Sequence, residues 1–225
     1  MHLLDNPIYH SLNSGHRLFA RETGDASYYI EDIAPFAGLK DNSVENFEAL
    51  YQNSAPESTF VVFTRQAYDV PKGWNLITQI DMFQMVYEHT SVPRGDGEFE
   101  ELTETHVAEM IELVKLTQPG PFKSKTIVLG NYIGVFQEEK LVAMAGHRFN
   151  PTPYIEISAV CTHPDHLGKG YAYLLLCAQI KRILAKGEVP FLHVRNDNEA
   201  AVKLYEKLGF VIRTAMIAYV LKKIA

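Results

Sequence analysis

The sequence predicts a mixed α/β fold in which helices cover the faces of a central sheet. Residues 154–162 have the β-branched and apolar content of a strand, and a glycine-containing loop and an apolar helix follow them up to residue 182. A second strand follows at 191–195, and a second helix ends at Gly209. This order of strand, helix and strand predicts a right-handed parallel crossover, with a ligand at the carboxyl ends of the strands.

Composition and charge limit the class of protein. The chain has 225 residues and a net charge of -6, so it can bury a full core and has no overall attraction to nucleic acid or to an anionic membrane. Its first residues form no charged-then-apolar leader, and no apolar run is long enough to cross a bilayer, so we expect a cytoplasmic protein. The two cysteines, Cys161 and Cys177, lack the spacing of disulfides or zinc sites, and we expect no metal.

Residues 1–96 are expected to form an accessory α+β domain that shapes the acceptor pocket and carries no chemical motif of its own. Apolar residues at helical spacing follow Asp41-Asn42-Ser43, which is typical of a helix cap. The run Phe60-Val61-Val62-Phe63 predicts a buried strand. The elements expected here are helices at 6–12 and 41–52 and strands at 27–31, 58–65 and 75–87.

A second domain is expected at 97–225. Proline and glycine residues between 90 and 98 break the periodicity, which places the boundary there. Two prolines within 118–122 end the first helix of this domain, and Glu138-Glu139 lies between two alternating segments that predict a hairpin. The elements expected before the central strand are a strand at 99–102, a helix at 104–116 and strands at 131–137 and 140–149.

The loop between the central strand and its helix can hold an anion. Gly168 and Gly170 lack a Cβ where the chain enters the helix, so several backbone N–H groups can turn toward one ligand. The helix macrodipole favours negative charge at this end. A phosphate group is therefore the expected ligand of the loop.

The segment Leu167-Gly168-Lys169-Gly170-Tyr171-Ala172 resembles the Q/R-x-x-G-x-G/A pyrophosphate loop of the GNAT superfamily of acyl-CoA-dependent N-acetyltransferases. Downstream, residues 192–195, Asn198 and residues 204–210 resemble the fifth strand, fourth helix and following turn of that superfamily. Leu167 departs from the pattern, which has Gln or Arg at this position. The side chain of Gln or Arg would supply one polar contact that leucine does not. The resemblance implies a GNAT fold at 97–225, N-acetyltransferase activity and acetyl-CoA as the acetyl donor.

The resemblance also assigns residues to the coenzyme. The backbone N–H of Val160 would polarise the thioester carbonyl, and the glycine loop would hold the pyrophosphate. Asn198 would bind the pantetheine or phosphate arm, and an Asn before a helix is also an ordinary N-cap. The residues expected to contact the coenzyme are Val160, Cys161, Thr162, Leu167, Gly168, Lys169, Gly170, Tyr171, Ala172, Asn198 and Tyr205.

Three side chains are candidates for catalysis. An alkylamine is almost fully protonated at neutral pH, so acetyl transfer to it requires a proton acceptor. Glu156 lies 14 positions before Gly170, which is the offset of the glutamate base in histone-type members of the superfamily. His193 stands where other members carry a base glutamate, and the choice between the two stays open. Tyr205 matches the tyrosine that returns a proton to the coenzyme thiolate, with helix packing as the alternative role.

Alternatives to this mechanism remain open from the sequence. Cys161 could carry the acetyl group covalently, but strand alternation places it on the face opposite Glu156 unless a bulge intervenes, which favours direct attack in a ternary complex. The alternative to an enzyme is a catalytically degenerate protein that senses acyl-CoA or scaffolds a partner. A second enzyme alternative is transfer of a longer acyl chain, or transfer to a hydroxyl acceptor. We expect a small-molecule or peptide amine as acceptor, no nucleic acid or membrane as partner, and a monomer or homodimer.

Overall fold

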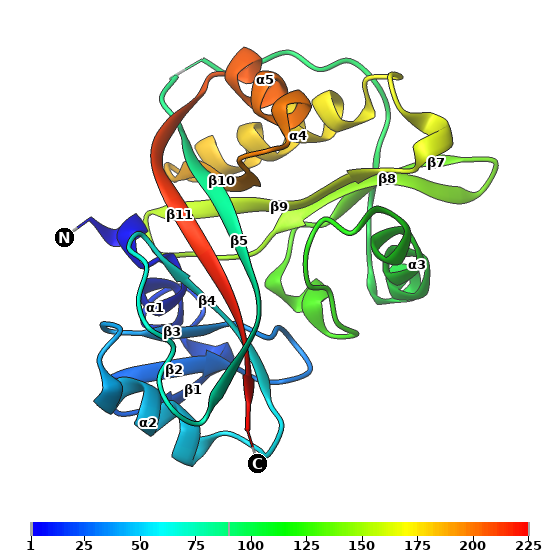
Figure 1. Ribbon diagram of the computed structural model, residues 1–225. Coiled ribbons are helices and arrows are strands. Elements are labelled where there is room, and N and C mark those ends of the chain that lie inside the picture. Colours follow the sequence, from blue (N-terminus) through cyan, green and yellow to red (C-terminus); the bar gives the residue numbers. More distant parts are fainter. Residues whose placement is uncertain (1, 90, 225) are drawn as a thin grey trace.

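The computed structural model describes residues 2–89 and 91–224 and contains two sheets (Figure 1). The large sheet has eight strands in the order β4-β11-β5-β10-β9-β8-β7-β6, and a small sheet has the order β1-β2-β3. Within the described residues, β9 and β10 run parallel and the other paired strands of the large sheet run antiparallel. The prediction of a mixed sheet flanked by helices is therefore confirmed.

Each element has defined bounds. The strands are β1 (Ala20–Thr23), β2 (Ala26–Tyr29), β3 (Ala37–Leu39), β4 (Thr59–Thr64), β5 (Trp74–Tyr87), β6 (Glu100–Glu101), β7 (Ile133–Gln137), β8 (Lys140–His147), β9 (Tyr154–Thr162), β10 (Val189–Arg195) and β11 (Phe210–Lys223). The α-helices are α1 (Pro7–Leu12), α2 (Val44–Asn53), α3 (Val107–Thr117), α4 (Tyr171–Leu184) and α5 (Glu199–Leu208). Short 3-10 helices are η1 (Leu3–Asp5), η2 (Arg17–Phe19), η3 (Glu104–His106), η4 (Thr126–Leu129) and η5 (Pro164–His166). None of the described helices has both the length and the apolar character that a bilayer crossing needs.

Local chemistry explains where these elements begin and turn. The Ser43 side chain accepts a hydrogen bond from the Asn46 N–H and caps α2, as its sequence predicts. Glu138 and Glu139 connect β7 to β8 with φ values of 50° and 62°, the left-handed conformation that a two-residue hairpin turn requires. Strands β1 and β3, of four and three residues, were not among the expected elements.

The strands on either side of residue 97 share one sheet. Strand β5 pairs with both β10 and β11, and β11 pairs with β4. The first part of the chain therefore contributes two strands to the sheet that carries the glycine loop. A division into domains at 1–96 and 97–225 stays a prediction, and a boundary at residue 97 falls between two strands of the same sheet.

Different parts of the chain cover the two faces of the large sheet (Figure 1). Helices α4 and α5 cover one face, where Ile155, Ile157, Leu176, Ile180 and Tyr205 pack together. The N-terminal segment covers part of the other face, where Leu4 and Ile8 pack in one core with Phe63 and Phe191. Helix α3 covers the same face further along, against β8 and β9.

Strand β9 contains a bulge near its centre. Met144 pairs with Cys161 and Gly146 with Ser158, so Ala145 lies opposite both Ala159 and Val160, and Ala159 has φ of 52°. One extra residue reverses the direction of every later side chain. Cys161 therefore packs in the α3 core, on the same face as Glu156, which is the outcome that the sequence left open if a bulge intervened.

Strands β9 and β10 pair only over their first residues. Val189, Pro190 and Phe191 pair with Tyr154, Ile155 and Glu156, although β9 continues to Thr162 and β10 to Arg195. Beyond Glu156 the two parallel strands separate. The bulge lies beside this opening, and the glycine loop follows at the end of β9.

We expect Gly146→Ala to lower the free energy of unfolding by about 1–3 kcal/mol, because it overfills the packing opposite the bulge. A Cβ on Gly146 would lie 2.3 Å from Cδ1 of the Tyr132 ring. Urea denaturation of Gly146→Ala, Tyr132→Leu and the double variant measures this coupling. Strictly additive effects would show that the two residues do not compete for the same space.

Candidate active site

The glycine loop presents backbone donors at the N-terminus of α4. Gly168 and Gly170 have φ of 75° and 82°, and Gly170 is the N-cap of α4 without a side-chain cap. Within the described residues, the N–H groups from Gly168 to Ala172 have no hydrogen-bond acceptor. No heavy atom lies within 4 Å of the position that a Cβ would take on either glycine. The loop therefore offers a cradle of free N–H groups that an anionic ligand can approach closely.

Side chains around the loop add positive charge and an open surface. Lys169 is exposed, and its Nζ lies 3.2 Å from Nδ1 of His166. The Tyr171 ring stacks on His166 at a centroid distance of 6.5 Å. Leu167 is 66% exposed, so it presents an apolar surface where a polar residue was part of the expected pattern. A hollow of about 630 Å³ lies beside Lys169, Gly170 and Tyr171.

The expected coenzyme residues on β9 divide between the two faces. Val160 packs among residues of the α4 side, and Cys161 packs among those of the α3 side. Thr162 is half-buried at the end of the strand. Asn198 caps α5 by accepting a hydrogen bond from the Ala201 N–H at 3.1 Å, as expected of an Asn at this position. A contact between these residues and a coenzyme stays a prediction.

The hydroxyl of Tyr205 makes no hydrogen bond within the described part of the chain. Its ring is buried beside Phe210, with a centroid distance of 6.1 Å. Burial raises the pKa of Tyr205 to about 12, with a smaller contribution from the Cys161 thiol. The phenol is therefore protonated at neutral pH and its hydrogen is free to be donated.

Glu156 lies in a buried ion pair that its sequence position did not reveal. Arg148 donates from Nε to Oε2 at 2.8 Å and from Nη2 to Oε1 at 2.6 Å, and Glu156 has no exposed surface. Burial alone would raise the pKa of Glu156, but the charge of Arg148, together with the hydrogen bonds from Arg148 and His193, outweighs it and lowers this pKa to about 2. Glu156 is a carboxylate at neutral pH and its proton affinity is very low.

His193 lies against the same carboxylate. Its Nδ1 is 2.6 Å from Oε1 of Glu156, and its side chain is 1% exposed. Its Nε2 lies 3.0 Å from Nε2 of Gln84. The structure thus brings together the two candidate bases, which lie on neighbouring strands.

The partners of Gln84 determine the tautomer of His193. Oε1 of Gln84 accepts from Nε of Arg213 at 2.8 Å, and its Nε2 donates to the Leu4 carbonyl at 2.8 Å. The amide nitrogen must therefore be the atom that faces His193, so Nε2 of His193 accepts and its Nδ1 donates to Glu156. Burial lowers the pKa of His193 against the opposing effect of Glu156, which agrees with a neutral ring.

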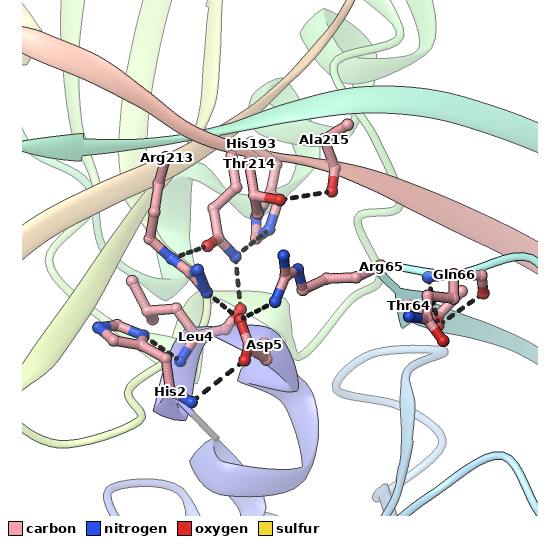
Figure 2. A network of polar contacts seen from close by, with 11 residues as sticks. His2, Leu4, Asp5, Thr64, Arg65, Gln66, His193, Arg213, Thr214 and Ala215 are labelled. Atoms are coloured by element: carbon pink, nitrogen blue, oxygen red, sulfur yellow. Dashed lines mark hydrogen bonds and ion pairs between the residues drawn. The ribbon is translucent and has the colours of Figure 1, made fainter.

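The polar contacts continue to the N-terminal segment. Figure 2 shows Arg213 and Arg65 converging on Asp5, close to His193. Arg65 Nη1 lies 3.2 Å from Oδ1 of Asp5, and Arg213 Nη2 pairs with the same oxygen. We refer to Arg148, Glu156, His193, Gln84, Arg213 and Asp5 as the buried polar network, and Arg65, whose side chain is 48% exposed, lies at its edge. The network joins η1 to strands β5, β9, β10 and β11 and to Arg148, which follows β8.

Sequence reasoning did not identify Arg148 or Gln84. Arg148 directly follows β8, and its guanidinium lies over the rings of Phe149, Phe36 and Phe63 at 4.9, 5.2 and 5.6 Å. An arginine inside the apolar run before residue 149 was the available signal. Its pairing with Glu156 depends on the β8–β9 register, which the sequence does not state.

Cys161 is poorly suited to nucleophilic attack. Although the bulge places it on the face of Glu156, burial raises the pKa of its thiol to about 11, against the smaller effects of contacts to Thr117 and Met144. A thiol of this pKa is protonated at neutral pH, and the thiolate is the reactive form.

Comparison with known proteins identifies relatives for this arrangement. Residues 132–218 match the family model described as FR47-like protein. The chain is 32% identical to a GNAT-family protein from Novosphingobium aromaticivorans, whose crystal structure superimposes with a TM-score of 0.92 over 100% of both chains. A GCN5-related N-acetyltransferase from Kribbella flavida shares the fold, with 12% identity and a TM-score of 0.60 over 96% of this chain and 95% of that one.

Curated relatives match over shorter segments. An acetyltransferase of Yersinia pestis is 42% identical over 50 residues, which are 21% of this chain and 35% of that protein. The N-alpha-acetyltransferase RimI of Mycobacterium tuberculosis is 35% identical over 83 residues, which are 36% of this chain and 51% of RimI. The chain thus spans about a third to a half of the length of these relatives.

We expect Glu156→Gln to lower the free energy of unfolding by about 3–5 kcal/mol at pH 7, because it leaves Arg148 buried without its counter-charge. Since the pKa of Glu156 falls from about 4.3 in the unfolded chain to about 2 in the fold, its stabilising effect is complete above the first value and is lost as pH falls through the second. Urea denaturation between pH 7 and pH 2 measures both effects. A variant as stable as the wild type would contradict the assigned pair.

We expect His193 to be neutral at pH 7, with its hydrogen on Nδ1, because Gln84 and Glu156 determine both ring contacts and burial lowers its pKa. Nitrogen-15 NMR of the histidine side chains distinguishes the protonated nitrogen from the accepting one and follows the titration. A His193 ring that gains a proton near pH 6.5 would contradict this assignment.

Proposed function

Because this chain belongs to the GNAT family of acetyltransferases, we propose that it transfers the acetyl group of acetyl-CoA to a primary amine of a small molecule or peptide. The observation that carries the proposal is the set of unpaired N–H groups from Gly168 to Ala172, at the end of a strand that separates from its parallel neighbour. An extended molecule with a pyrophosphate at this loop could follow the opening between β9 and β10. Acetyl-CoA would supply the thioester whose acetyl group is transferred.

Different residues would contact different parts of the coenzyme. The N–H groups of the loop would hold the pyrophosphate, and Lys169 would add a positive charge. The Val160 N–H, beside the bulge, would donate to the thioester oxygen, and Thr162 would line the path between them. Asn198, at the start of α5, would reach the pantetheine arm while it caps the helix.

Tyr205 would serve as the proton donor for the leaving thiolate. Its hydroxyl has no hydrogen-bond partner within the described residues, and with a pKa of about 12 it is protonated at neutral pH. The same chain offers no reactive thiolate at Cys161, which supports direct attack of the amine over a covalent intermediate.

Glu156 and His193 remain the two predicted proton acceptors, but their contacts limit how they can act. Both oxygens of Glu156 already accept hydrogen bonds, and Nε2 of His193 accepts one from Gln84. A carboxylate with a pKa of about 2 cannot hold a proton taken from an alkylammonium. We propose that this pair orients Arg148 and that either residue takes part in proton transfer only after a contact in the network opens.

Acetyl-CoA binding and amine-dependent release of free thiol test the proposed function. Calorimetric titration with acetyl-CoA is followed by a thiol assay on a panel of primary amines. Gly168→Val should weaken acetyl-CoA binding at least tenfold, because its branched side chain enters the space that the pyrophosphate would occupy. Binding without turnover on any amine would favour a sensor of acyl-CoA, and absence of binding would refute the proposal.

Gly187→Val is the matched control for this variant. Gly187 has φ of 72°, close to the 75° of Gly168, and its Cβ position is equally open, but it lies beyond the other end of α4. Both variants carry the same backbone strain. Equal losses of acetyl-CoA affinity in the two variants would show that backbone strain, and not the position of Gly168 in the loop, causes the loss.

A further inference from the structure

The two candidate bases are closed to a molecule that reaches the bulge. Oε1 of Glu156 accepts from Arg148 and His193, Oε2 accepts from Arg148, and the carboxylate has no exposed surface. The His193 ring is 1% exposed, with Nδ1 as the donor to Glu156 and Nε2 as the acceptor from Gln84. Neither residue can take a proton from a bound molecule in this arrangement.

Other titratable side chains around the pair hold their protons. Tyr29 and Tyr132 are buried, and burial raises the pKa of both phenols. Burial likewise raises the pKa of the Cys161 thiol to about 11. All three groups are protonated at neutral pH, so none of them is a proton acceptor there.

Arg148 presents a positive charge beside the bulge. Its Nη1 has no hydrogen-bond partner among the described residues and would lie 3.8 Å from a Cβ on Gly120, in the turn that follows α3. Arg148 and Gly120 line a small cavity together with Ser158 and Ala159 of β9. In the described part of the chain no carboxylate lines this cavity. A cation that enters it therefore meets the guanidinium without a counter-charge.

The size of this cavity adds a second constraint. Its volume is about 10 Å³, the room that one water molecule needs, so an amino group fits and nothing larger. Ser158 lines the cavity, and a serine hydroxyl can accept a hydrogen bond from one amine N–H. An ammonium group has three N–H donors and would leave its water behind, which is costly where few acceptors replace that water.

We propose that the acceptor binds as a neutral amine, so that the substrate is an amine of low basicity, such as an arylamine or an amine beside an electron-withdrawing carbonyl group. The occupied bases do not deprotonate an alkylammonium, and the guanidinium and the small cavity oppose its entry. This inference rests on the proposed function and adds the class of its acceptor.

A neutral amine needs no base of the protein. Its nitrogen attacks the carbonyl carbon of the thioester, and the bond between that carbon and the sulfur breaks. The nitrogen loses one proton and the sulfur gains one, which the Tyr205 hydroxyl relays, so no proton remains on the protein. An alkylammonium carries one proton more, and the buried polar network could accept that proton only after one of its contacts opens.

Ethylamine and 2,2,2-trifluoroethylamine test the inference with the wild-type protein and acetyl-CoA. The two amines have similar shapes, but ethylamine is an ammonium ion below about pH 10, and the fluorines keep trifluoroethylamine neutral over the range used. We expect kcat/KM for ethylamine to rise about tenfold per pH unit between about pH 6.5 and 8.5, with its neutral fraction, and kcat/KM for trifluoroethylamine to stay constant within about twofold.

The ratio of the two kcat/KM values therefore changes about 100-fold over this range. Because trifluoroethylamine does not titrate there, it corrects for any ionisation of the protein, and the reaction of each amine without protein is subtracted. A ratio that stays constant would show that the protein binds the ammonium ion and removes its proton. That result would overturn the inference while the proposed function stands.

Fluorine-19 NMR with coenzyme A present separates this inference from the proposed function, because it measures binding without turnover. The probe is 2,2-difluoroethylamine, which titrates near neutral pH, and 2,2-difluoroethanol is the control of similar shape that does not titrate. We expect the affinity of the amine alone to rise about tenfold between about pH 6 and 8, as the ammonium loses its proton. This rise without acetylation of any amine would support the neutral-amine site while the proposed function fails. Equal affinity at both pH values, or tighter binding of the ammonium, would overturn the inference.

Discussion

The buried pair of Arg148 and Glu156 is the interaction on which the arrangement of the site depends. Moving two charges into the interior costs free energy, and their attraction offsets that cost only with good geometry and further hydrogen bonds. Here two hydrogen bonds join the pair, three rings enclose the guanidinium and His193 donates to the carboxylate. The pair therefore tolerates little displacement of β8, β9 or β10, and the buried polar network extends this constraint to η1.

The bulge in β9 changes which face of the sheet each later side chain of the strand points to. Before it, the α4 face receives Ile155 and Ile157 while Glu156 lies on the opposite face; after it, Val160 faces α4 and Cys161 faces α3. The parallel pairing with β10 ends at Glu156. The opening between the strands thus lies beside the bulge, and the loop of free N–H groups follows the end of β9.

Local signals in the sequence were sufficient for most elements and for the loop. The glycines at 168 and 170 have the positive φ that their spacing indicated, and Ser43 and Asn198 cap the helices that they precede. Such features depend on neighbouring residues alone. The roles of Arg148 and Gln84 depend on contacts across strands, and the sequence contains no local signal for strand register.

Sequence by itself determined the family, the mixed sheet, the glycine loop at the start of α4 and a set of titratable residues, because each has a short pattern tied to backbone geometry. Only the tertiary structure decided the state of those residues. Glu156 stood as a candidate base in the sequence, and its burial beside Arg148 makes it a strongly held carboxylate. A pKa depends on every charge and on the amount of water around a group, and these come from segments far apart in the chain.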